Sequence, residues 1–321
     1  MEAPIEKVKV GAKVKGYFKL QWKNMKRNSS IIWFLIPALI FTFLFGYVPM
    51  LGVIFAFKQD INPSNWFYDV LTQPFTFDWI AKIFIDPDVL KAIGNTLIIS
   101  SLKLVIIFPL NIIMAILLSE IKSQRLSKLL LIILCLPNFL SWPVTIGIWN
   151  NLLGLDDGLI NNIIAGLGGE RIYFFQDHFK FLVIFLSAWK TLGWGSIYFY
   201  AAILSIDKEY YEAATIDGAT KLQKIRYLTL PGIKSVIALM LVMNITYILD
   251  AGFDQVYSMM NLVKSVTYDE QILGTYIFNL AMSNSNIPFA VAMSVVNGLL
   301  ALFLMLGGNT LVKKKLGRSL W

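Results

Sequence analysis

The stretch "YYEAATIDGATKLQKIRYLTLPG", residues 210–232, is the most informative part of this sequence. It is polar and punctuated by Ala and Gly, and it lies between two long apolar segments. Asp207 can cap a helix over residues 208–216 by accepting hydrogen bonds from free backbone N–H groups. Gly218 suits the left-handed position that ends a helix, and a second short helix is expected over residues 219–228. The stretch therefore predicts two short helices joined at a glycine, a projection that suits a groove in another protein.

One face of the first predicted helix carries two small side chains. Tyr210, Ala213, Ala214 and Asp217 recur at the spacing i, i+3, i+4, i+7 and therefore share a face. The two alanines allow another surface to approach closely. Pro231 is expected to start the next apolar segment. No residue of the stretch is suited to catalysis.

The composition indicates an integral membrane protein. Hydrophobic residues make up 57% of the 321 residues and charged residues 15%, whereas soluble domains carry about 25% charged residues. The net charge of +8 does not indicate nucleic-acid binding, because the charges flank apolar segments and form no continuous basic face. One cysteine, Cys135, and one histidine, His178, make a disulfide framework or a Cys/His metal cluster within the chain untenable.

Six apolar segments are long enough to span a bilayer, which takes about 20 residues in a helix. The sequence therefore predicts an all-α polytopic membrane protein whose six-helix domain covers residues 31–321, after a basic segment over residues 1–30. Pro137 and Pro143 predict a kinked third helix that is buried in the bundle. The predicted spans are residues 31–57, 92–118, 129–149, 181–204, 233–249 and 288–307.

The distribution of basic residues predicts the orientation. Twenty of the 28 Lys and Arg residues fall in the two termini and the loops that share their side, and six fall in the alternate loops. The excess of basic residues marks the cytoplasmic side, so both termini and residues 210–232 are expected in the cytoplasm. The basic segment 1–30, with its interleaved aromatic residues, is expected to bind anionic lipid, and docking to a partner protein is the alternative.

Sequence signatures of catalysis are missing. Gly11 and Gly16 have the spacing of a phosphate-binding loop, but Tyr17 and Phe18 stand where Lys and Ser or Thr are required. No serine-hydrolase, zinc-protease or calcium-loop motif occurs. We expect no catalytic, nucleotide or metal site in this chain, so the energy for any transport would come from a partner or an ion gradient.

Residues 206–232 resemble the "EAA" loop of ATP-binding cassette (ABC) importer permeases. The family pattern is EAA, three residues, Gly, nine residues and Ile-x-Leu-Pro. Leu228 stands here for the usual Ile, and Asp207 stands where sugar permeases often have Pro. In that family the loop couples the permease to the ATPase. The resemblance assigns this coupling role to Tyr210, Glu212, Ala213, Ala214, Asp217, Gly218, Ala219, Leu230 and Pro231.

The resemblance extends over nearly the whole chain. Stretches such as "LPNFLSWPVTIGIWNNLL", "AWKTLGWGSIYFYAAILSID" and the closing "GRSLW" resemble permeases for complex oligosaccharides in Gram-positive bacteria. The resemblance implies a type I importer in the bacterial cell membrane. Its implied partners are a second homologous permease, two cytoplasmic subunits that bind ATP and Mg, and an extracellular solute-binding lipoprotein. By analogy, Glu212 would pair with a basic residue of the ATPase, and Gly218 would provide the bend.

Sugars bind to aromatic faces and to polar side chains that contact their hydroxyls. Lys190 stands out, because an ionisable group within a span usually faces a cavity or a partner, and Asp250 is a candidate counter-ion. Snorkelling of Lys190 and an interfacial belt of aromatic residues are the alternative. The pathway candidates are Asn138, Trp142, Trp149, Asn150, Trp189, Lys190, Trp194, Tyr198, Tyr200, Asn244, Tyr247 and Asp250.

Two other functions fit part of the sequence. A secondary transporter would explain the spans and Lys190, but it would not need the cytoplasmic helical projection, and no internal repeat is visible. A permease of the same superfamily for amino acids, peptides or osmolytes would share the loop and differ in cargo. Co-purification of an ATPase tests the first alternative, and ligand assays on the partner binding protein test the second.

Overall fold

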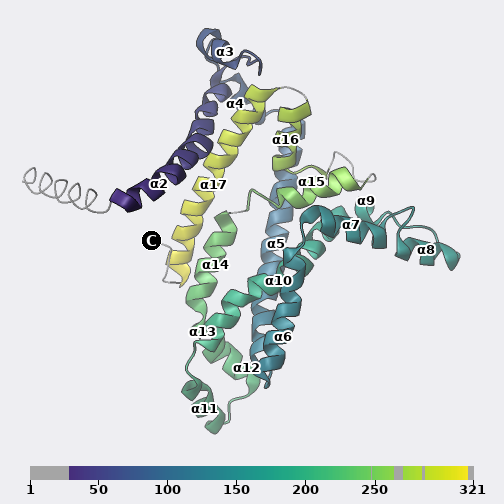
Figure 1. Ribbon diagram of the computed structural model, residues 1–321. Coiled ribbons are helices and arrows are strands. Elements are labelled where there is room, and N and C mark those ends of the chain that lie inside the picture. Colours follow the sequence, from purple (N-terminus) through teal and green to yellow (C-terminus); the bar gives the residue numbers. More distant parts are fainter. Residues whose placement is uncertain (1–28, 247, 264–269, 284–285, 317–321) are drawn as a thin grey trace, which may run out of the picture. The chain divides into compact units, whose positions relative to one another are not determined.

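The computed structural model describes residues 29–246, 248–263, 270–283 and 286–316 (Figure 1). These residues form helices joined by loops, and the extended structure among them is one isolated bridge between Lys58 and Phe75. The chain divides into a unit before residue 55 and a larger unit, Phe55–Trp321. The two units are described separately.

The described part of the first unit, residues 29–54, is a single apolar helical segment. It contains α2 (Ser29–Thr42), a π-helical turn (Phe43–Tyr47) and most of a 3-10 helix (Val48–Phe57). Pro49 has no N–H group to give to a helical hydrogen bond, which accounts for the change of helix type beside it. The large apolar side chains between residues 33 and 53 are mostly exposed, as expected for a helix that contacts lipid or another chain.

The second unit begins with two short helices and continues through the helices that build the bundle. In chain order its elements are α3 (Trp66–Thr72), α4 (Asp78–Ile83), α5 (Pro87–Ser119), α6 (Gln124–Cys135), η3 (Leu136–Phe139), α7 (Trp142–Leu153), α8 (Leu159–Gly166), α9 (Phe174–Asp177), α10 (Phe179–Leu204), α11 (Lys208–Ile216), α12 (Lys221–Lys224), η4 (Ile225–Thr229), α13 (Leu230–Gly232), α14 (Lys234–Thr246), α15 (Phe253–Leu262), α16 (Leu273–Ser283) and α17 (Ile287–Leu316).

Four helical segments of the described chain are long and apolar enough to cross a membrane: Trp33–Phe57, Pro87–Ser119, Phe179–Leu204 and Ile287–Lys314. Two bent helix pairs raise the number to six if each pair is one span. The helical membrane fold predicted from the sequence is confirmed. The six spans predicted from the sequence do not include the short helices α15 and α16.

The third span differs from the prediction. Instead of one kinked helix over residues 129–149, a helix over Gln124–Phe139 ends at a sharp break, and Trp142–Leu153 continues at 97° to it. Pro137 and Pro143 flank the break and cannot donate backbone hydrogen bonds. The polar backbone at the break is satisfied from the neighbouring helix α10, as the candidate site shows below.

The fifth span also differs. Pro231 was expected to start it, but Pro231 lies within α13, and the chain bends by 64° at Ile233 between Lys221–Gly232 and α14. At its other end α14 stops at Thr246. Ala251 and Gly252 then have left-handed backbone angles, with φ of 49° and 84°. The span therefore has a bend at one end and irregular backbone at the other.

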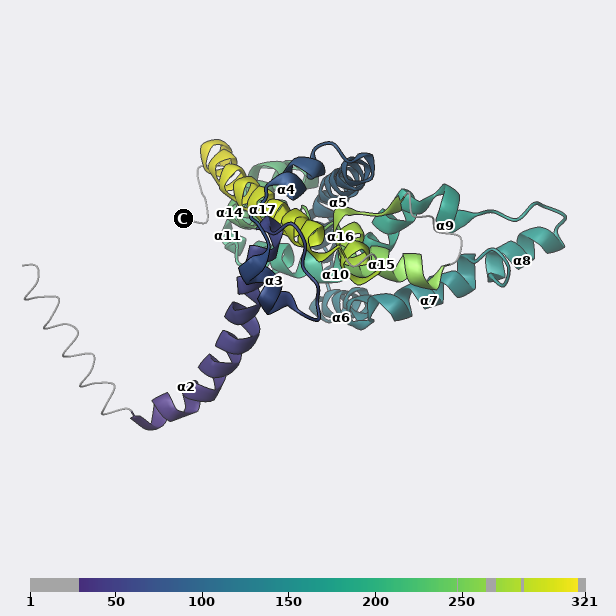
Figure 2. The same cartoon turned by 90° about the horizontal axis from the view of Figure 1, so that it is seen from above.

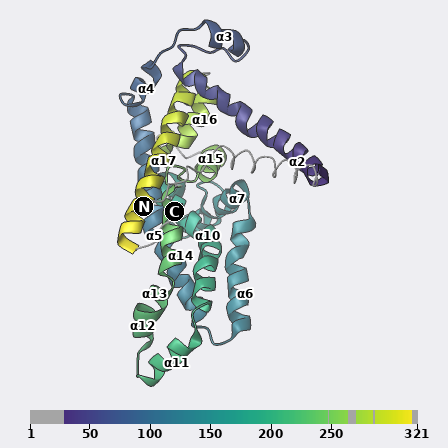
Figure 3. The same cartoon turned by 90° about the vertical axis from the view of Figure 1, so that its left-hand side faces the viewer.

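Helix α10 is the centre of the second unit. Twelve of its 26 residues are buried, and it runs beside α5 and α6 (Figures 1 and 3). One cluster packs Val183 and Leu186 of α10 against α5, α7 and α15, and another packs Phe199 and Ile203 near the opposite end of the helix. This packing holds both ends of span five, at Ile233 and at Ala251, against one frame.

Two other parts extend from this frame. Helices α11 and α12 lie at one end of the unit, and α3 and α4 lie at the opposite end (Figures 1 and 3). Helix α8 lies at the tip of an arm that leads away from α7 (Figure 2). The side chain of Asn161 is fully buried in this arm and bonds the backbone of Leu153, Gly154 and Ile172, which ties the arm together.

Candidate functional site

Residues 206–232 form the two short helices predicted from the sequence. The Asp207 side chain accepts a hydrogen bond from the backbone N–H of Glu209 (3.1 Å), and α11 ends before Gly218, whose φ is +75°. The backbone N–H of Ala219 returns to the Ala214 carbonyl oxygen (2.9 Å). The cap, the extent of the first helix and the left-handed glycine are confirmed.

The second short helix starts at Lys221, two residues later than predicted. Thr220 is its N-cap, in a capping box with Gln223. The backbone N–H of Thr220 donates to Gln223 Oε1 (2.7 Å), and the backbone N–H of Gln223 donates to Thr220 Oγ1 (3.4 Å). The sequence TKLQ carries this signal, because Thr followed three residues later by Gln is a typical helix start.

Two side-chain hydrogen bonds join α11 to α12 and to η4, which follows α12. Lys224 Nζ donates to Thr215 Oγ1 (2.6 Å), and the hydroxyl groups of Tyr211 and Thr229 lie 2.9 Å apart. These four residues were not among the predicted site residues. Sequence spacing alone does not show which side chains of two short helices meet.

The pair presents an open surface with a hollow of about 330 Å³. The large apolar side chains of Tyr210, Ile216, Leu222 and Tyr227 are 64–87% exposed on it. Of the predicted coupling residues, Ala214, Asp217, Gly218 and Ala219 line the hollow. Tyr210, Glu212, Ala213 and Pro231 are exposed outside it, and Leu230 is half-buried. Exposed apolar side chains gathered in this way mark an interaction surface.

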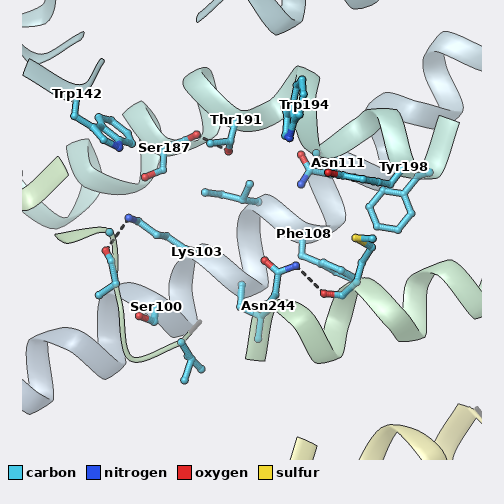
Figure 4. A pocket seen from close by; sticks show the side chains of 18 residues that line it. Ser100, Lys103, Phe108, Asn111, Trp142, Ser187, Thr191, Trp194, Tyr198 and Asn244 are labelled. Carbon is cyan, nitrogen blue, oxygen red and sulfur yellow. Dashed lines mark hydrogen bonds between the residues drawn. The ribbon is translucent and has the colours of Figure 1, made fainter. Parts of the chain in front are cut away.

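A second candidate site is a cavity of about 380 Å³ within the bundle (Figure 4). It is lined by helices α5, α10 and α14, by Trp142 of α7 and by the irregular segment after α14. Its lining combines aromatic rings with hydroxyl and amide groups. The lining residues are Ser100, Lys103, Leu104, Ile107, Phe108, Asn111, Trp142, Ser187, Thr191, Trp194, Gly195, Tyr198, Phe199, Met240, Asn244, Ile248, Ala251 and Gly252.

Four of the predicted pathway residues line this cavity: Trp142, Trp194, Tyr198 and Asn244. The polar residues of α5 that line it, Ser100, Lys103 and Asn111, were not predicted. Their signal in the sequence was the presence of Lys and Asn inside an otherwise apolar span. The Ser100 hydroxyl and the Asn111 carbonyl oxygen are buried without a hydrogen-bond partner among the described residues.

The other predicted pathway residues lie elsewhere. Trp149 packs edge-on against Trp189, with ring centroids 5.7 Å apart, and against Phe185. The Tyr200 hydroxyl lies 2.9 Å from that of Ser127 and joins α10 to α6. Asn138 and Asn150 are half-buried away from the cavity, and Tyr247 lies outside the described residues.

Lys190 holds the break in the third span. Its ammonium group is buried and donates to the backbone carbonyl oxygens of Pro137 (3.2 Å), Asn138 (3.0 Å) and Leu140, and it lies 5.3 Å from the Trp142 ring centroid. The suggested pairing with Asp250 is not formed, because Asp250 is exposed and lines a separate cavity with Thr246 and Phe253. Lys190 therefore satisfies carbonyl groups that the broken helix leaves free.

We expect Lys190→Met to lower the stability of the permease by about 2 kcal/mol, because buried carbonyl groups lose a charged donor. The measurement is the unfolding temperature of the purified protein in detergent. Lys180→Met, which changes a half-buried lysine at the start of the same helix, is the matched control. Equal unfolding temperatures for Lys190→Met and the wild type would contradict this role.

Lys103 joins three parts of the bundle at the cavity. Its ammonium group donates to the Ala251 carbonyl oxygen and to Gln255 Oε1, both at 2.9 Å. Gln255 is fully buried, and its amide donates to the Val183 carbonyl oxygen (2.8 Å) while its Oε1 also accepts from Ser187 (2.7 Å). This network ties α5, α10 and α15 to the irregular end of span five.

In the part of the chain that the structure describes, no three His, Cys, Asp or Glu side chains gather at a site that could hold a metal ion. The two candidate sites present surfaces that suit binding. One is an exposed helical surface, and the other is a polar and aromatic cavity.

Residues 107–316 match the family of binding-protein-dependent transport system inner membrane components. The chain belongs to this family. Protein LplB of Bacillus subtilis (strain 168) is 34% identical over 90% of each chain. The polygalacturonan/rhamnogalacturonan transport system permease protein YteP of the same organism is 33% identical over 87% of this chain and 86% of its own.

Solved structures agree with this assignment. A crystal structure of a bacterial ABC transporter involved in the import of the acidic polysaccharide alginate contains a chain that is 32% identical, with a TM-score of 0.80 over 92% of this chain and 99% of that chain. A complex of the bacterial alginate ABC transporter with an alginate pentasaccharide-bound periplasmic protein gives the same identity and TM-score. The protein is thus a permease of an ABC importer, and the secondary-transporter alternative is wrong.

Proposed function

We propose that this permease forms, with a second similar permease, the pathway by which an oligosaccharide enters a bacterial cell. A solute-binding protein outside the membrane delivers the sugar, and two cytoplasmic subunits that bind ATP and Mg supply the energy. ATP hydrolysis belongs to those subunits and not to this chain. The observation that carries the proposal is the cavity of about 380 Å³ with its mixed aromatic and polar lining.

The composition of the cavity fits a sugar. Trp142, Trp194 and Tyr198 offer ring faces to the C–H surfaces of a pyranose, and Asn111 and Asn244 offer amide groups to its hydroxyls. The volume lies in the range of about 300–1,000 Å³ that is typical of ligand sites. The relatives named for polygalacturonan and rhamnogalacturonan transport and the transporter of alginate favour sugar cargo over amino acids, peptides or osmolytes.

The pair α11–α12 is the proposed contact with the ATPase. Its exposed apolar side chains and its hollow suit a groove in a partner. The hydrogen bonds Lys224–Thr215 and Tyr211–Thr229 make the pair move as one body. From there the chain continues through η4 and α13 into α14, which carries Met240 and Asn244 to the cavity. Displacement of the pair by the ATPase would therefore reach the cavity wall, as alternating access requires.

The proposed orientation places the termini and the pair α11–α12 in the cytoplasm, because these segments carry the excess of Lys and Arg. Residues 1–30 would then lie at the cytoplasmic face, where their basic side chains meet anionic lipid. The loops on the other side, including the arm with α8, would face the binding protein.

The test is transport by the complete complex in proteoliposomes. With ATP inside and the binding protein outside, a labelled oligosaccharide of the cargo class is expected to accumulate, and the same complex without the binding protein is expected to import little. Accumulation of an amino acid or a peptide with no sugar uptake would overturn the proposed cargo.

We expect Trp194→Ala to lower the affinity of the pathway for the oligosaccharide about tenfold, because loss of one stacking ring removes roughly 1–1.5 kcal/mol. Trp194 is 44% exposed, so the fold should tolerate the change. The concentration dependence of uptake measures it. Trp194→Phe is the control, because it keeps an aromatic face and should stay within about threefold of the wild type.

A further inference from the structure

The cavity carries one kind of charge. Among the described residues that line it, Lys103 is the charged side chain, and the rest are apolar, aromatic, hydroxyl or amide groups. A lysine within a membrane span is costly and usually pairs with another group or marks a pathway. Lys103 is half-buried and meets only neutral oxygen atoms in its two hydrogen bonds, to Ala251 and Gln255.

The surroundings hold the ammonium group in place and leave part of it free. Gly252 allows the close approach, because a Cβ atom there would lie 2.7 Å from Lys103 Nζ. An ammonium group has three N–H donors, and two of them are directed to Ala251 and Gln255. The third can reach a ligand in the cavity. Figure 4 shows the Lys103 side chain extended across the cavity toward the wall that carries Ser187 and Trp142.

Two further polar groups of α5 belong to the same site. Ser100, Lys103 and Asn111 fall on one face of α5, because positions i, i+3 and i+11 lie within about 80° around a helix of 3.6 residues per turn. The Ser100 hydroxyl is buried, with 5% of the residue exposed, and neither it nor the Asn111 carbonyl oxygen has a hydrogen-bond partner among the described residues. Unpaired buried polar atoms are uncommon in native structures, and both residues lie in the α5 wall of the cavity that also carries Lys103.

We propose that the cavity binds a negatively charged sugar, with the carboxylate of a uronic acid unit accepting a hydrogen bond from Lys103. Trp194 and Tyr198 would hold the pyranose ring while the exposed amide group of Asn244 binds its hydroxyl groups. This inference rests on the proposed function and names the class of its cargo. The ion pair stabilises the complex because a hydrogen bond between two charged groups is shorter and stronger than one between neutral groups.

The charge count favours a carboxylate over a phosphate group. A phosphate monoester carries close to two negative charges near neutral pH, and sites for it commonly use the forked donors of arginine. The described lining offers one ammonium group and no arginine. Asp250 is the acidic residue whose charge acts on Lys103, but it is exposed and lines the separate cavity, so water weakens its effect.

The experiment measures ligand binding to the complete transporter in lipid nanodiscs, without the binding protein, by titration calorimetry. The ligands are trigalacturonate and galactotriose, which share size and ring type and differ in charge. We expect the wild type to bind trigalacturonate at least tenfold more tightly. Lys103→Gln should remove that preference, because its side chain is polar but carries no charge. Lys103→Arg should keep the preference.

Lys128→Gln is the matched control, because it removes an exposed lysine outside the cavity and should change neither affinity. Equal binding of the two sugars by the wild type would overturn the inference, and so would an undiminished preference in Lys103→Gln. No binding of trigalacturonate to the wild type would also overturn it. Galactose 1-phosphate and galacturonate form a second pair of ligands, which differ in the acidic group. Tighter binding of galactose 1-phosphate than of galacturonate would contradict the choice of a carboxylate.

Uptake by the same transporter in proteoliposomes distinguishes this inference from the proposed function. If a neutral oligosaccharide is imported with ATP and the binding protein while Lys103→Gln has no selective effect, the proposed function stands and the charged cargo is wrong. If no sugar of either kind is imported, the proposed function itself fails.

Discussion

The substitution Gly193→Ala should prevent this permease from accumulating as a stable protein in the membrane. A Cβ atom at Gly193 would lie 2.3 Å from the backbone carbonyl carbon and oxygen of Leu134. Those atoms belong to the backbone of α6, so no side-chain rotation relieves the contact. Helices α6 and α10 must separate, and we expect a cost of about 3 kcal/mol or more.

The measurement is the unfolding temperature of the purified protein together with its level in the membrane. Gly94→Ala is the matched control, because Gly94 also lies within a helix and a Cβ atom there would meet nothing within 4 Å. That control should be neutral or slightly stabilising, since Ala is favoured over Gly in helices by about 0.5–1 kcal/mol. A Gly193→Ala protein as stable as Gly94→Ala would show that α6 and α10 do not pack this closely.

Charge reversal at Glu212 should uncouple the importer while leaving the permease folded. Glu212 is exposed on α11, so its change disturbs little within the chain. If Glu212 pairs with a basic residue of the ATPase, Glu212→Lys replaces attraction with repulsion, at a cost of about 3 kcal/mol or more. Sugar uptake should fall by at least about a hundredfold, and the unfolding temperature of the isolated permease should not change.

Sugar uptake measures transport, and ATPase activity shows whether hydrolysis is still coupled to it. Co-purification of the ATPase shows whether the contact with α11 persists. Glu170→Lys is the control, since it makes the same charge change at an exposed position away from α11 and α12. Its co-purification with the ATPase should match that of the wild type. Normal uptake by Glu212→Lys would remove the coupling role from this residue, whatever the role of the rest of the pair.

The coupling pair shows how much local sequence decides. The cap at Asp207, the helix over Lys208–Ile216 and the left-handed Gly218 follow from residues close in the chain, and all three are present. The start of the second helix was missed by two residues, because Thr220 with Gln223 caps it more strongly than Ala219 begins it. Local hydrogen-bonding rules were sufficient here because both partners of each bond lie within a few residues of each other.

The cavity shows the opposite case. Trp142, Trp194, Tyr198 and Asn244 were predicted from residue type and do line it, but Trp149, Trp189 and Tyr200 have the same chemical character and pack elsewhere. Residue type cannot separate the two groups, because an aromatic side chain stabilises a buried cluster as well as a ligand site.

The sequence by itself determined that the chain is a helical membrane protein with a projecting helix pair, since composition, apolar length and local capping are properties of short segments. The tertiary structure decided what the two lysines within the spans do. Lys190, the more prominent candidate, bonds the carbonyl oxygens of a broken helix, and Lys103 reaches the cavity. The physical reason is that a buried ammonium group is stabilised by whichever oxygen atoms the fold brings beside it, and those atoms lie 50 or more residues away in the chain.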